Sequence, residues 1–286
     1  MFLPDLLIRP IVENALAEDL GRGGDVTAEL IPVGTRMHAV FASRKAGRVS
    51  GIACARIAIR TMDPLAHVVA SLVDGDAVAP GQEIVRVEAD ARALLTAERT
   101  ALNLMGRMSG IATLTEAYVK AVDGTRAIIV DTRKTTPGLR ALEKFAVRCG
   151  GGVNHRFGLD DAILIKDNHI AACGGVAEAL TRARAVAGHL TPIEVEVDNL
   201  DQFDVALAFA PDVIMLDNFS TDDMRKAVVR NAGRVKLEAS GGVSLDTVRA
   251  IAETGVNAIS VGALTHSAPV LDIGLDAVRG GCATRP

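Results

Sequence analysis

The sequence predicts an α/β protein in which a small mixed α+β domain precedes a longer array of alternating strands and helices. Of its 286 residues, 49% are hydrophobic and 23% are charged, which is typical of a globular protein that buries a large core. Tryptophan is absent and tyrosine occurs once, so we expect an aliphatic core, as in parallel sheets covered by helices. In the second half of the chain, short apolar runs alternate with amphipathic helical patterns.

The first part of the chain mixes helical and strand-like patterns at irregular spacing. Residues 10–20 carry apolar side chains at helical spacing after Pro10, which suits the first turn of a helix. A second helical pattern covers residues 52–62. Strand-like runs are expected near residues 37–44, 66–73 and 83–89.

The domain boundary is predicted within a helical pattern that runs from Ala91 to about Val122, with interruptions at Gly106 and Gly110. The predicted N-terminal α+β domain covers residues 1–108, and the second domain covers residues 109–267. The C-terminal segment 268–286 is predicted to join the N-terminal domain, with residues 279–286 as a frayed tail.

Apolar runs in the second domain are predicted to be parallel strands, because helical patterns follow most of them. These six runs cover residues 127–130, 162–165, 193–197, 213–216, 235–237 and 258–261. Right-handed crossovers would arrange them as an open doubly wound sheet or as a barrel with fewer than the eight strands of a complete TIM barrel.

Charge and cysteine usage exclude several classes of function. The formal net charge of −4 provides no general positive field for nucleic acid, so anion binding must be local. The four cysteines are scattered without metal-ligand spacing, which predicts reduced thiols in a cytoplasmic protein. No apolar run is long enough to span a membrane, and polar residues and prolines interrupt the apolar N-terminus. We expect neither nucleic acid nor membrane as a partner.

Polar side chains follow each apolar run at the point where the strand is predicted to end. They are Asp131-Thr-Arg-Lys134, Lys166-Asp-Asn-His169, Glu196-Val-Asp198, Asp217-Asn218, Glu238-Ala-Ser-Gly-Gly242 and Gly262. Within residues 193–198, period-two alternation places Glu194, Glu196 and Asp198 on one face and the valines on the other. Because ligands bind at the carboxyl ends of parallel strands, we expect these groups to converge on one site.

Basic residues are concentrated between Asp131 and Arg156, where six basic side chains stand against two acidic ones. Three of them recur at four-residue spacing on a predicted helix over residues 137–149 and are interpreted as a solvated face: Arg140, Lys144 and Arg148. The others follow a buried strand or three flexible glycines and are interpreted as ligands for an anion, together with the adjacent histidine: Arg133, Lys134, His155 and Arg156.

Two glycine features indicate a phosphate site. Ser240-Gly241-Gly242 ends a strand and precedes a helix predicted from Leu245, and Gly262 holds the equivalent place one strand later. Free backbone N–H groups and the helix dipole favour an anion at such positions. In barrels, phosphate is commonly bound after the last two strands.

These motifs resemble the quinolinate phosphoribosyltransferase family (nicotinate-nucleotide pyrophosphorylase, decarboxylating). The resemblance rests on Asp131-Thr-Arg-Lys-Thr-Thr-Pro-Gly-Leu-Arg140, on Gly151-Gly-Val-Asn-His-Arg156 and on Ile165-Lys-Asp-Asn-His169. Shorter matches occur, in the same order, over most of the chain at residues 95–103, 109–112, 194–196, 216–219, 238–242 and 261–266.

The resemblance implies a mixed α+β N-terminal domain followed by an incomplete, about six-stranded α/β barrel of TIM type. It also implies synthesis of nicotinate mononucleotide, pyrophosphate and CO2 from quinolinate and phosphoribosyl pyrophosphate, with Mg²⁺, in NAD biosynthesis. The expected assembly is a homodimer or a larger homo-oligomer, in which the active site is shared between subunits.

The resemblance assigns roles to individual residues. The quinolinate and pyrophosphate region is lined by Arg99, Arg133, Lys134, Thr135, His155, Arg156 and Lys166. The expected catalytic residues are Lys134, Lys166, Glu196 and Asp217, and the last two face the ribose and its Mg²⁺. The 5′-phosphate is held by Ser240, Gly241, Gly242 and Gly262. Arg44 is expected to reach in from the neighbouring subunit.

Three alternatives remain open from the sequence. A lysine after a barrel strand, Lys166 or Lys134, would suit a Schiff-base aldolase. A related pyrophosphorylase-like protein of molybdenum utilisation shares several of the motifs. A non-catalytic binding module would hold phosphoribosyl pyrophosphate without turnover.

Overall fold

The computed structural model describes residues 2–284, with the backbone alone over residues 279–284. The chain folds into two compact units. The first unit comprises Met1–Glu116, Thr135–Gly151 and Ser267–Pro286, and the second comprises Ala117–Lys134 and Gly152–His266. The chain therefore passes between the units more than once. The boundaries differ from the predicted domains chiefly in placing residues 109–116 and 135–151 with the first unit.

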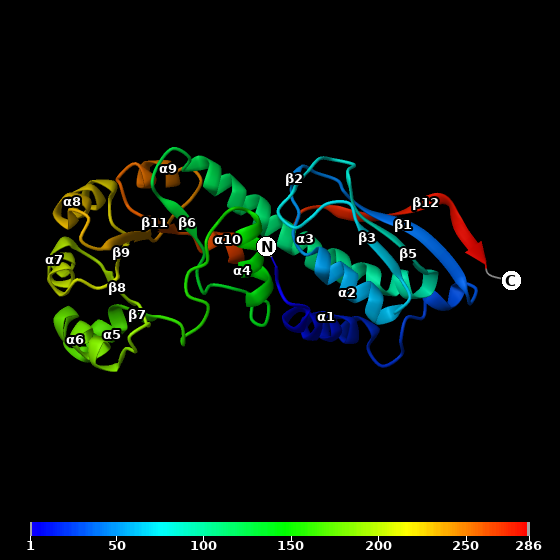
Figure 1. The fold of residues 1–286 in the computed structure, drawn as a ribbon, viewed down its shortest axis with the longest axis horizontal. Coiled ribbons are helices and arrows are strands. Elements are labelled where there is room, and N and C mark those ends of the chain that lie inside the picture. Colours follow the sequence, from blue (N-terminus) through cyan, green and yellow to red (C-terminus); the bar gives the residue numbers. More distant parts are fainter. Residues whose placement is uncertain (1, 285–286) are drawn as a thin grey trace. The chain divides into compact units, whose positions relative to one another are not determined.

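The first unit is built on an antiparallel sheet with the strand order β12-β1-β5-β3 (Figure 1). Its strands are β1 (Thr35–Ser43), β3 (His67–Ala70), β5 (Glu83–Asp90) and β12 (Ile273–Thr284), and β2 (Gly47–Arg48) pairs separately with β4 (Ala77–Val78). The helices are α1 (Asp5–Leu20), the 3-10 helix η1 (Ala28–Leu30), α2 (Ile52–Met62), α3 (Ala91–Ala121) and α4 (Arg140–Cys149).

Helix α1 begins earlier than its sequence pattern indicated. Pro10 lies inside the helix rather than in its first turn. Proline removes only the hydrogen bond to the carbonyl of Leu6, and Leu6 is exposed, so water can satisfy that carbonyl. Helix α2 has the predicted bounds.

Helix α3 is continuous, so the prediction of interruptions at Gly106 and Gly110 is wrong. The glycines are there because residues 269–271 pass close to the helix. A Cβ atom at Gly110 would lie 1.9 Å from the carbonyl oxygen of Pro269. The carbonyl of Gly106 accepts a hydrogen bond of 3.0 Å from the N–H of Leu271. The small residues thus allow a close contact and do not end the helix.

Helix α4 does not present the solvated face that its basic residues suggested. Lys144 is 2% exposed and Glu143 is fully buried. The Glu143 carboxylate accepts hydrogen bonds from Arg107, from the Thr136 hydroxyl at 2.8 Å and from the Thr136 N–H at 3.0 Å. Four-residue spacing of charges identifies a helix, but it does not show which face is buried.

The second unit contains a six-stranded parallel sheet with the order β6-β11-β10-β9-β8-β7, which confirms the predicted strands and the incomplete barrel. The strands are β6 (Ile128–Val130), β7 (Ile163–Ile165), β8 (Ile193–Val197), β9 (Val213–Asp217), β10 (Lys236–Ser240) and β11 (Ala258–Ser260). The helices are α5 (Asp167–Cys173), α6 (Val176–Val186), α7 (Leu200–Phe209), α8 (Thr221–Asn231), α9 (Val248–Ala252) and α10 (Ala263–His266).

The register of this sheet aligns the ends of its strands. Val197 pairs with Leu216, and Ser240 pairs with Asp217. Val195 and Val197 are fully buried, as their alternation with acidic residues predicted. After β10, the chain makes a turn in which the N–H of Ser244 donates to the hydroxyl of Thr247, so α9 begins later than the predicted position.

At the end of the chain, β12 continues to Thr284, which pairs with Thr35 of β1. The predicted frayed tail over 279–286 is therefore wrong as far as Thr284, because backbone pairing holds the strand; residues 285–286 lie outside the described residues. Within residues 2–284, none of the helices is both long and apolar enough to cross a membrane.

Candidate active site

Asp131, directly after β6, fixes the glycine-rich segment that carries two predicted site residues. Its buried carboxylate accepts hydrogen bonds from the side-chain amide of Asn154 at 2.6 Å and from the N–H of His155 at 2.9 Å. This contact places His155 and Arg156 beside the strand end that carries Arg133. The flexible glycines before them permit the approach.

Arg133 and Arg156 carry charges that act on one another. Burial lowers the pKa of Arg156, and the nearby Arg133 lowers it further, while Glu194 and Asp161 oppose the change. Among the described residues, the Nε atoms of both arginines are buried without a hydrogen-bond partner. Two adjacent guanidinium groups with unused donors form a site for an anion, above all for a carboxylate.

A lysine and a carboxylate meet at the next strand ends. Lys166, after β7, places its Nζ atom 2.7 Å from Oε2 of Glu196 on β8. The lysine is half-exposed, whereas the Glu196 side chain is 11% exposed. The prediction that these two residues share a site is consistent with this contact.

The ends of β9 and β10 are joined through Asn218. Its side-chain amide donates to Oδ2 of Asp217 at 2.6 Å, and its N–H donates to the carbonyl of Ser240 at 2.9 Å. Gly241 has a φ of +91°, and a Cβ atom there would lie 2.1 Å from Oδ1 of Asn218. Only glycine fits this position without a rearrangement.

A hydrogen bond connects the segment after β6 to α10. The hydroxyl of Thr265 donates to the carbonyl of Lys134 at 2.8 Å. A Cβ atom at Gly262 would lie 3.1 Å from Cδ of Lys134. Lys134 and Gly262 are thus neighbours.

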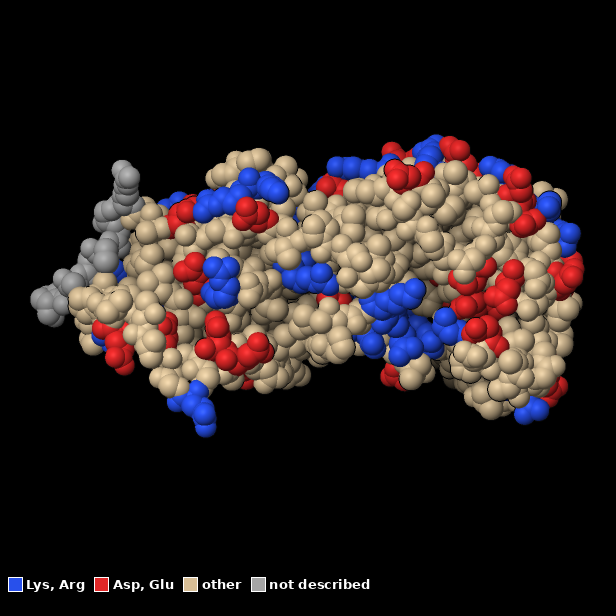
Figure 2. Space-filling model, turned by 180° about the vertical axis from the view of Figure 1, so that it is seen from behind, with Lys and Arg blue, Asp and Glu red and all other residues tan. Residues whose placement is uncertain are grey.

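On the right half of Figure 2, basic side chains gather beside a group of acidic ones.

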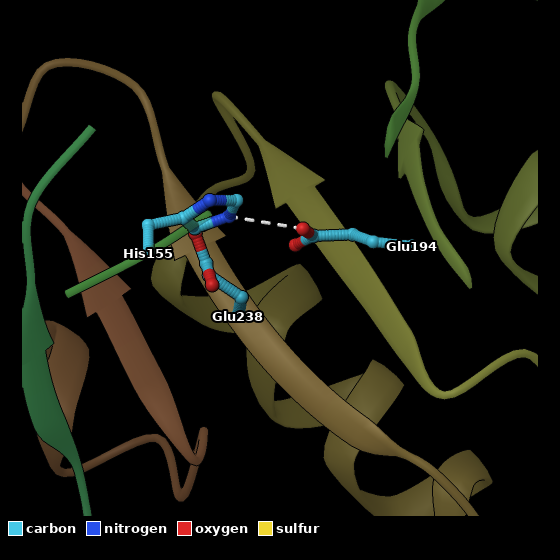
Figure 3. Close-up of side chains that lie close together, drawn as sticks. All are labelled: His155, Glu194 and Glu238. Carbon is cyan, nitrogen blue, oxygen red and sulfur yellow. Dashed lines mark ion pairs between the residues drawn. The ribbon is translucent and has the colours of Figure 1, made fainter. Parts of the chain in front are cut away.

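A buried cluster of His155, Glu194 and Glu238 lies among the strands themselves, since Glu194 is the second residue of β8 and Glu238 is the third residue of β10 (Figure 3). Nε2 of His155 is 2.9 Å from Oε2 of Glu194 and 3.6 Å from Oε1 of Glu238. Burial raises the pKa of Glu238 to about 8, with the Glu194 carboxylate adding to the rise and His155 opposing it. The three side chains line part of a cavity of about 570 Å³.

Sequence reasoning included Glu194 and Glu238 among the polar groups expected to converge on one site, but it gave neither residue a specific role there. Both stand inside a strand, two residues before a predicted site residue, and both are almost fully buried. A glutamate that alternates with buried valine or alanine in a short parallel strand is the signal that could have identified them, because it must face the interior of the barrel.

Three predicted site residues belong to the first unit. Arg44 is bonded through both Nη atoms to the carboxylate of Asp276, at 2.8 and 2.6 Å. Arg99 lies on an exposed part of α3. The hydroxyl of Thr135 accepts a hydrogen bond of 3.0 Å from Nε of Arg140.

The fold is that of an α/β-barrel enzyme, and charged side chains of both signs gather at the carboxyl ends of its strands. Residues 25–109 match the model for the quinolinate phosphoribosyl transferase N-terminal domain, and residues 111–276 match the model for its C-terminal domain. The chain therefore belongs to the quinolinate phosphoribosyltransferase family.

Named relatives agree with this assignment. The chain is 50% identical to a nicotinate-nucleotide pyrophosphorylase [carboxylating] of Mycobacterium leprae, over 94% of this chain and 96% of the relative. It is 44% identical to a probable enzyme of the same name in Bacillus subtilis, over 95% and 93% of the two chains. A nicotinate-nucleotide pyrophosphorylase structure from Francisella tularensis superposes with a TM-score of 0.93 at 40% identity, covering 97% and 98%.

These comparisons confirm the family, fold and enzyme class that the sequence motifs indicated. The chain is a pentosyltransferase of the quinolinate phosphoribosyltransferase type, which acts in NAD biosynthesis. The alternatives of a Schiff-base aldolase and of a molybdenum-utilisation protein are not favoured.

Proposed function

We propose that this chain transfers the phosphoribosyl group of phosphoribosyl pyrophosphate to the ring nitrogen of quinolinate, with loss of pyrophosphate and CO2, to give nicotinate mononucleotide. The observation that carries the proposal is the pair of guanidinium groups on Arg133 and Arg156, each with a buried, unused Nε donor among the described residues. Quinolinate is a planar dicarboxylate, and arginine binds a planar carboxylate through two parallel hydrogen bonds.

The lysines and the carboxylates stabilise charges of opposite sign that develop during the reaction. Lys134 and Lys166 compensate the negative charge that develops on the departing pyrophosphate. As the bond to pyrophosphate breaks, positive charge builds on the ribose ring, and Glu196 and Asp217 stabilise it from the side of the ribose hydroxyls. The ion pair of Lys166 with Glu196 keeps both groups in place before substrate binds.

The 5′-phosphate is bound at the ends of β10 and β11. The hydroxyl of Ser240 and the backbone N–H groups of Gly241, Gly242 and Gly262 supply the hydrogen bonds. Gly241 and Gly242 both have positive φ, and successive glycines of this kind let the backbone approach the phosphate closely.

The carboxylates also fit Mg²⁺. Glu196 and Asp217 stand at the ends of adjacent strands and offer the oxygen atoms that this ion prefers. They would hold it directly, or through water and the ribose hydroxyls. When bound, the ion neutralises charge on the pyrophosphate group.

Decarboxylation needs no separate acid–base pair to begin. Once the ring nitrogen carries the ribose, the C–C bond to the neighbouring carboxylate breaks, and its electron pair is stabilised beside the positive pyridinium nitrogen. A proton then replaces CO2 on that carbon. The chain's contribution is to hold and desolvate the carboxylate.

Turnover is tested by incubating the purified protein with quinolinate, phosphoribosyl pyrophosphate and Mg²⁺ and measuring CO2 and nicotinate mononucleotide. Arg133→Ala is expected to lower kcat/KM about 100-fold, because a charge-assisted contact is worth about 2 to 3 kcal/mol. Arg182→Ala is the matched control, since Arg182 is 65% exposed on α6 and pairs with Glu178. If quinolinate is inert and nicotinate reacts, the substrate assignment is wrong.

The proposed assembly is a cytoplasmic homodimer or larger homo-oligomer in which Arg44 completes the site of a neighbouring subunit. Arg44→Ala and Arg133→Ala are each expected to be nearly inactive. Mixing the two after dissociation should restore roughly a quarter of wild-type activity, because half of random dimers are hybrids with one intact site. No recovery in proven hybrids would place Arg44 in the site of its own subunit or outside any site.

A further inference from the structure

The loop between Arg156 and β7 is closed by the side chain of Asp161. Oδ2 of Asp161 accepts a hydrogen bond of 2.6 Å from the N–H of Phe157, and Oδ1 accepts one of 3.0 Å from the N–H of Gly158. Phe157 is 50% exposed and Leu159 is 74% exposed, so apolar packing gives this turn little support. A carboxylate that holds two successive N–H groups restricts such a loop to few conformations.

The turn brings the far end of the loop back to Arg156. Nη1 of Arg156 donates a hydrogen bond of 3.1 Å to the carbonyl of Ala162, which directly precedes β7. Among the described residues, Nε of Arg156 is buried and has no hydrogen-bond partner. The protein thus holds one nitrogen of the guanidinium and leaves the donor at Nε for a ligand.

Asp161 also acts on the charge of Arg156. Burial lowers the pKa of Arg156 and the nearby Arg133 lowers it further, whereas Glu194 and Asp161 oppose the change. Burial alone would raise the pKa of Asp161, but the N–H groups of the turn and the charge of Arg156 lower it. An ionised carboxylate near two guanidinium groups offsets their mutual repulsion.

Asp131 fixes only the other side of Arg156. Its carboxylate holds the side chain of Asn154 and the N–H of His155, which precede the arginine in the chain. These contacts place the backbone, but an arginine side chain has several rotatable bonds and loses much conformational entropy when it is held. The guanidinium itself is held through the carbonyl of Ala162, after the turn.

We propose that Asp161 is a positioning residue for quinolinate binding: by closing the turn, it holds the Arg156 guanidinium against the carbonyl of Ala162 and keeps the Nε donor available to a substrate carboxylate. Asp161 does not touch the substrate and acts through Arg156. This inference rests on the proposed function, because it assigns Arg156 to the substrate carboxylate.

Substitutions at Asp161 test this role in steady-state kinetics. Asp161→Ala removes both acceptors and the charge, so the KM for quinolinate should rise about tenfold, with kcat and the KM for phosphoribosyl pyrophosphate within about twofold of wild type. Asp161→Asn keeps one acceptor oxygen and should limit the rise in KM to about threefold. A tenfold loss of kcat with an unchanged KM would overturn the proposal.

The matched control is Asp160→Ala. Asp160 is exposed and carries the same charge one position earlier in the chain, but the N–H groups of the turn donate to Asp161. The KM for quinolinate should therefore stay within about twofold of wild type in this variant. A rise equal to that of Asp161→Ala would show that only the charge of the loop matters, and it would contradict the proposal.

A double-mutant cycle shows whether Asp161 acts through Arg156. Arg156→Ala is expected to raise the KM for quinolinate about 100-fold, because it removes a charge-assisted contact. Adding Asp161→Ala to that variant should change the KM by less than about twofold, because the guanidinium that Asp161 positions is gone. If Asp161→Ala raises the KM about tenfold in both backgrounds, its effect does not pass through Arg156 and the proposal is wrong.

The turn can be examined without substrate. By NMR, the backbone amides of Phe157 and Gly158 should exchange with solvent faster in Asp161→Ala than in wild type or Asp160→Ala, because they lose their acceptor. Unchanged exchange at both amides would overturn the proposal. Absence of quinolinate turnover by the wild type would instead refute the proposed function, and the dependence of the turn on Asp161 would still be seen in the exchange rates.

Discussion

At the scale of single residues, Asp74 stabilises the start of a helix that lies before it in the sequence. Helix α2 begins after Gly51, which has no side chain to cap it. Oδ1 of Asp74 accepts hydrogen bonds from the N–H of Gly51 at 2.8 Å and from the N–H of Ile52 at 3.1 Å. Burial nevertheless raises the pKa of Asp74, so the carboxylate form is disfavoured in the fold.

Substitutions at Asp74 should therefore separate the hydrogen bonds from the charge. Asp74→Ala removes the acceptor and should lower the free energy of unfolding by about 1 to 2 kcal/mol. Asp74→Asn keeps the acceptor. Because the carboxyl pKa is raised in the fold, the wild type loses stability as the pH rises above the ordinary pKa of aspartate. The free energy of unfolding of Asp74→Asn should therefore increase relative to that of the wild type between pH 4 and pH 7. Urea unfolding across this range measures both effects, and equal losses for the two variants would contradict the account.

At the scale of elements, the period of the hydrophobic residues predicted the helices and strands more accurately than the positions of glycines or charged residues did. All six parallel strands lie within a few residues of their predicted positions, because buried runs such as 193–197 are continuous or alternate strictly. The prediction at Gly110 is wrong because glycine is needed there to make room for the carbonyl of Pro269. Pro269 is distant in the sequence, so the local sequence pattern does not reveal this contact. The prediction at Lys144 is wrong because helical spacing is the same on a buried and an exposed face.

In the candidate site, too, the sequence predicted some features and not others. Its charged strand ends were predictable, since topology alone brings the ends of parallel strands to one edge. The contact of Lys166 with Glu196 follows from that rule. The contacts of Glu194 and Glu238 with His155 did not follow, because they depend on side-chain geometry that joins three separate segments of the chain.

At the scale of the whole molecule, the first unit depends on residues from both ends of the chain. Strand β12 pairs with β1 and begins with Ile273, which is 8% exposed, and the segment before it supplies Leu271, which is 6% exposed. The carbonyl of Ala268 also accepts a hydrogen bond from Arg107. Loss of each large buried side chain costs about 2 to 5 kcal/mol, against a total stability of about 5 to 15 kcal/mol for a typical domain.

A chain that ends at His266 should consequently lose the fold of its first unit. Hydrogen exchange is expected to show β1 and β5 unprotected, because β1 would lose its pairing with β12 and become an edge strand over an opened core. Strands β8, β9 and β10 in the second unit should keep their protection. Adding a peptide of residues 267–286 should restore protection of β1. Val270→Ala in the full chain is the control, since Val270 is 63% exposed and its loss should leave exchange unchanged. Full protection of β1 in the shortened chain would show that the first unit folds without its C-terminal strand.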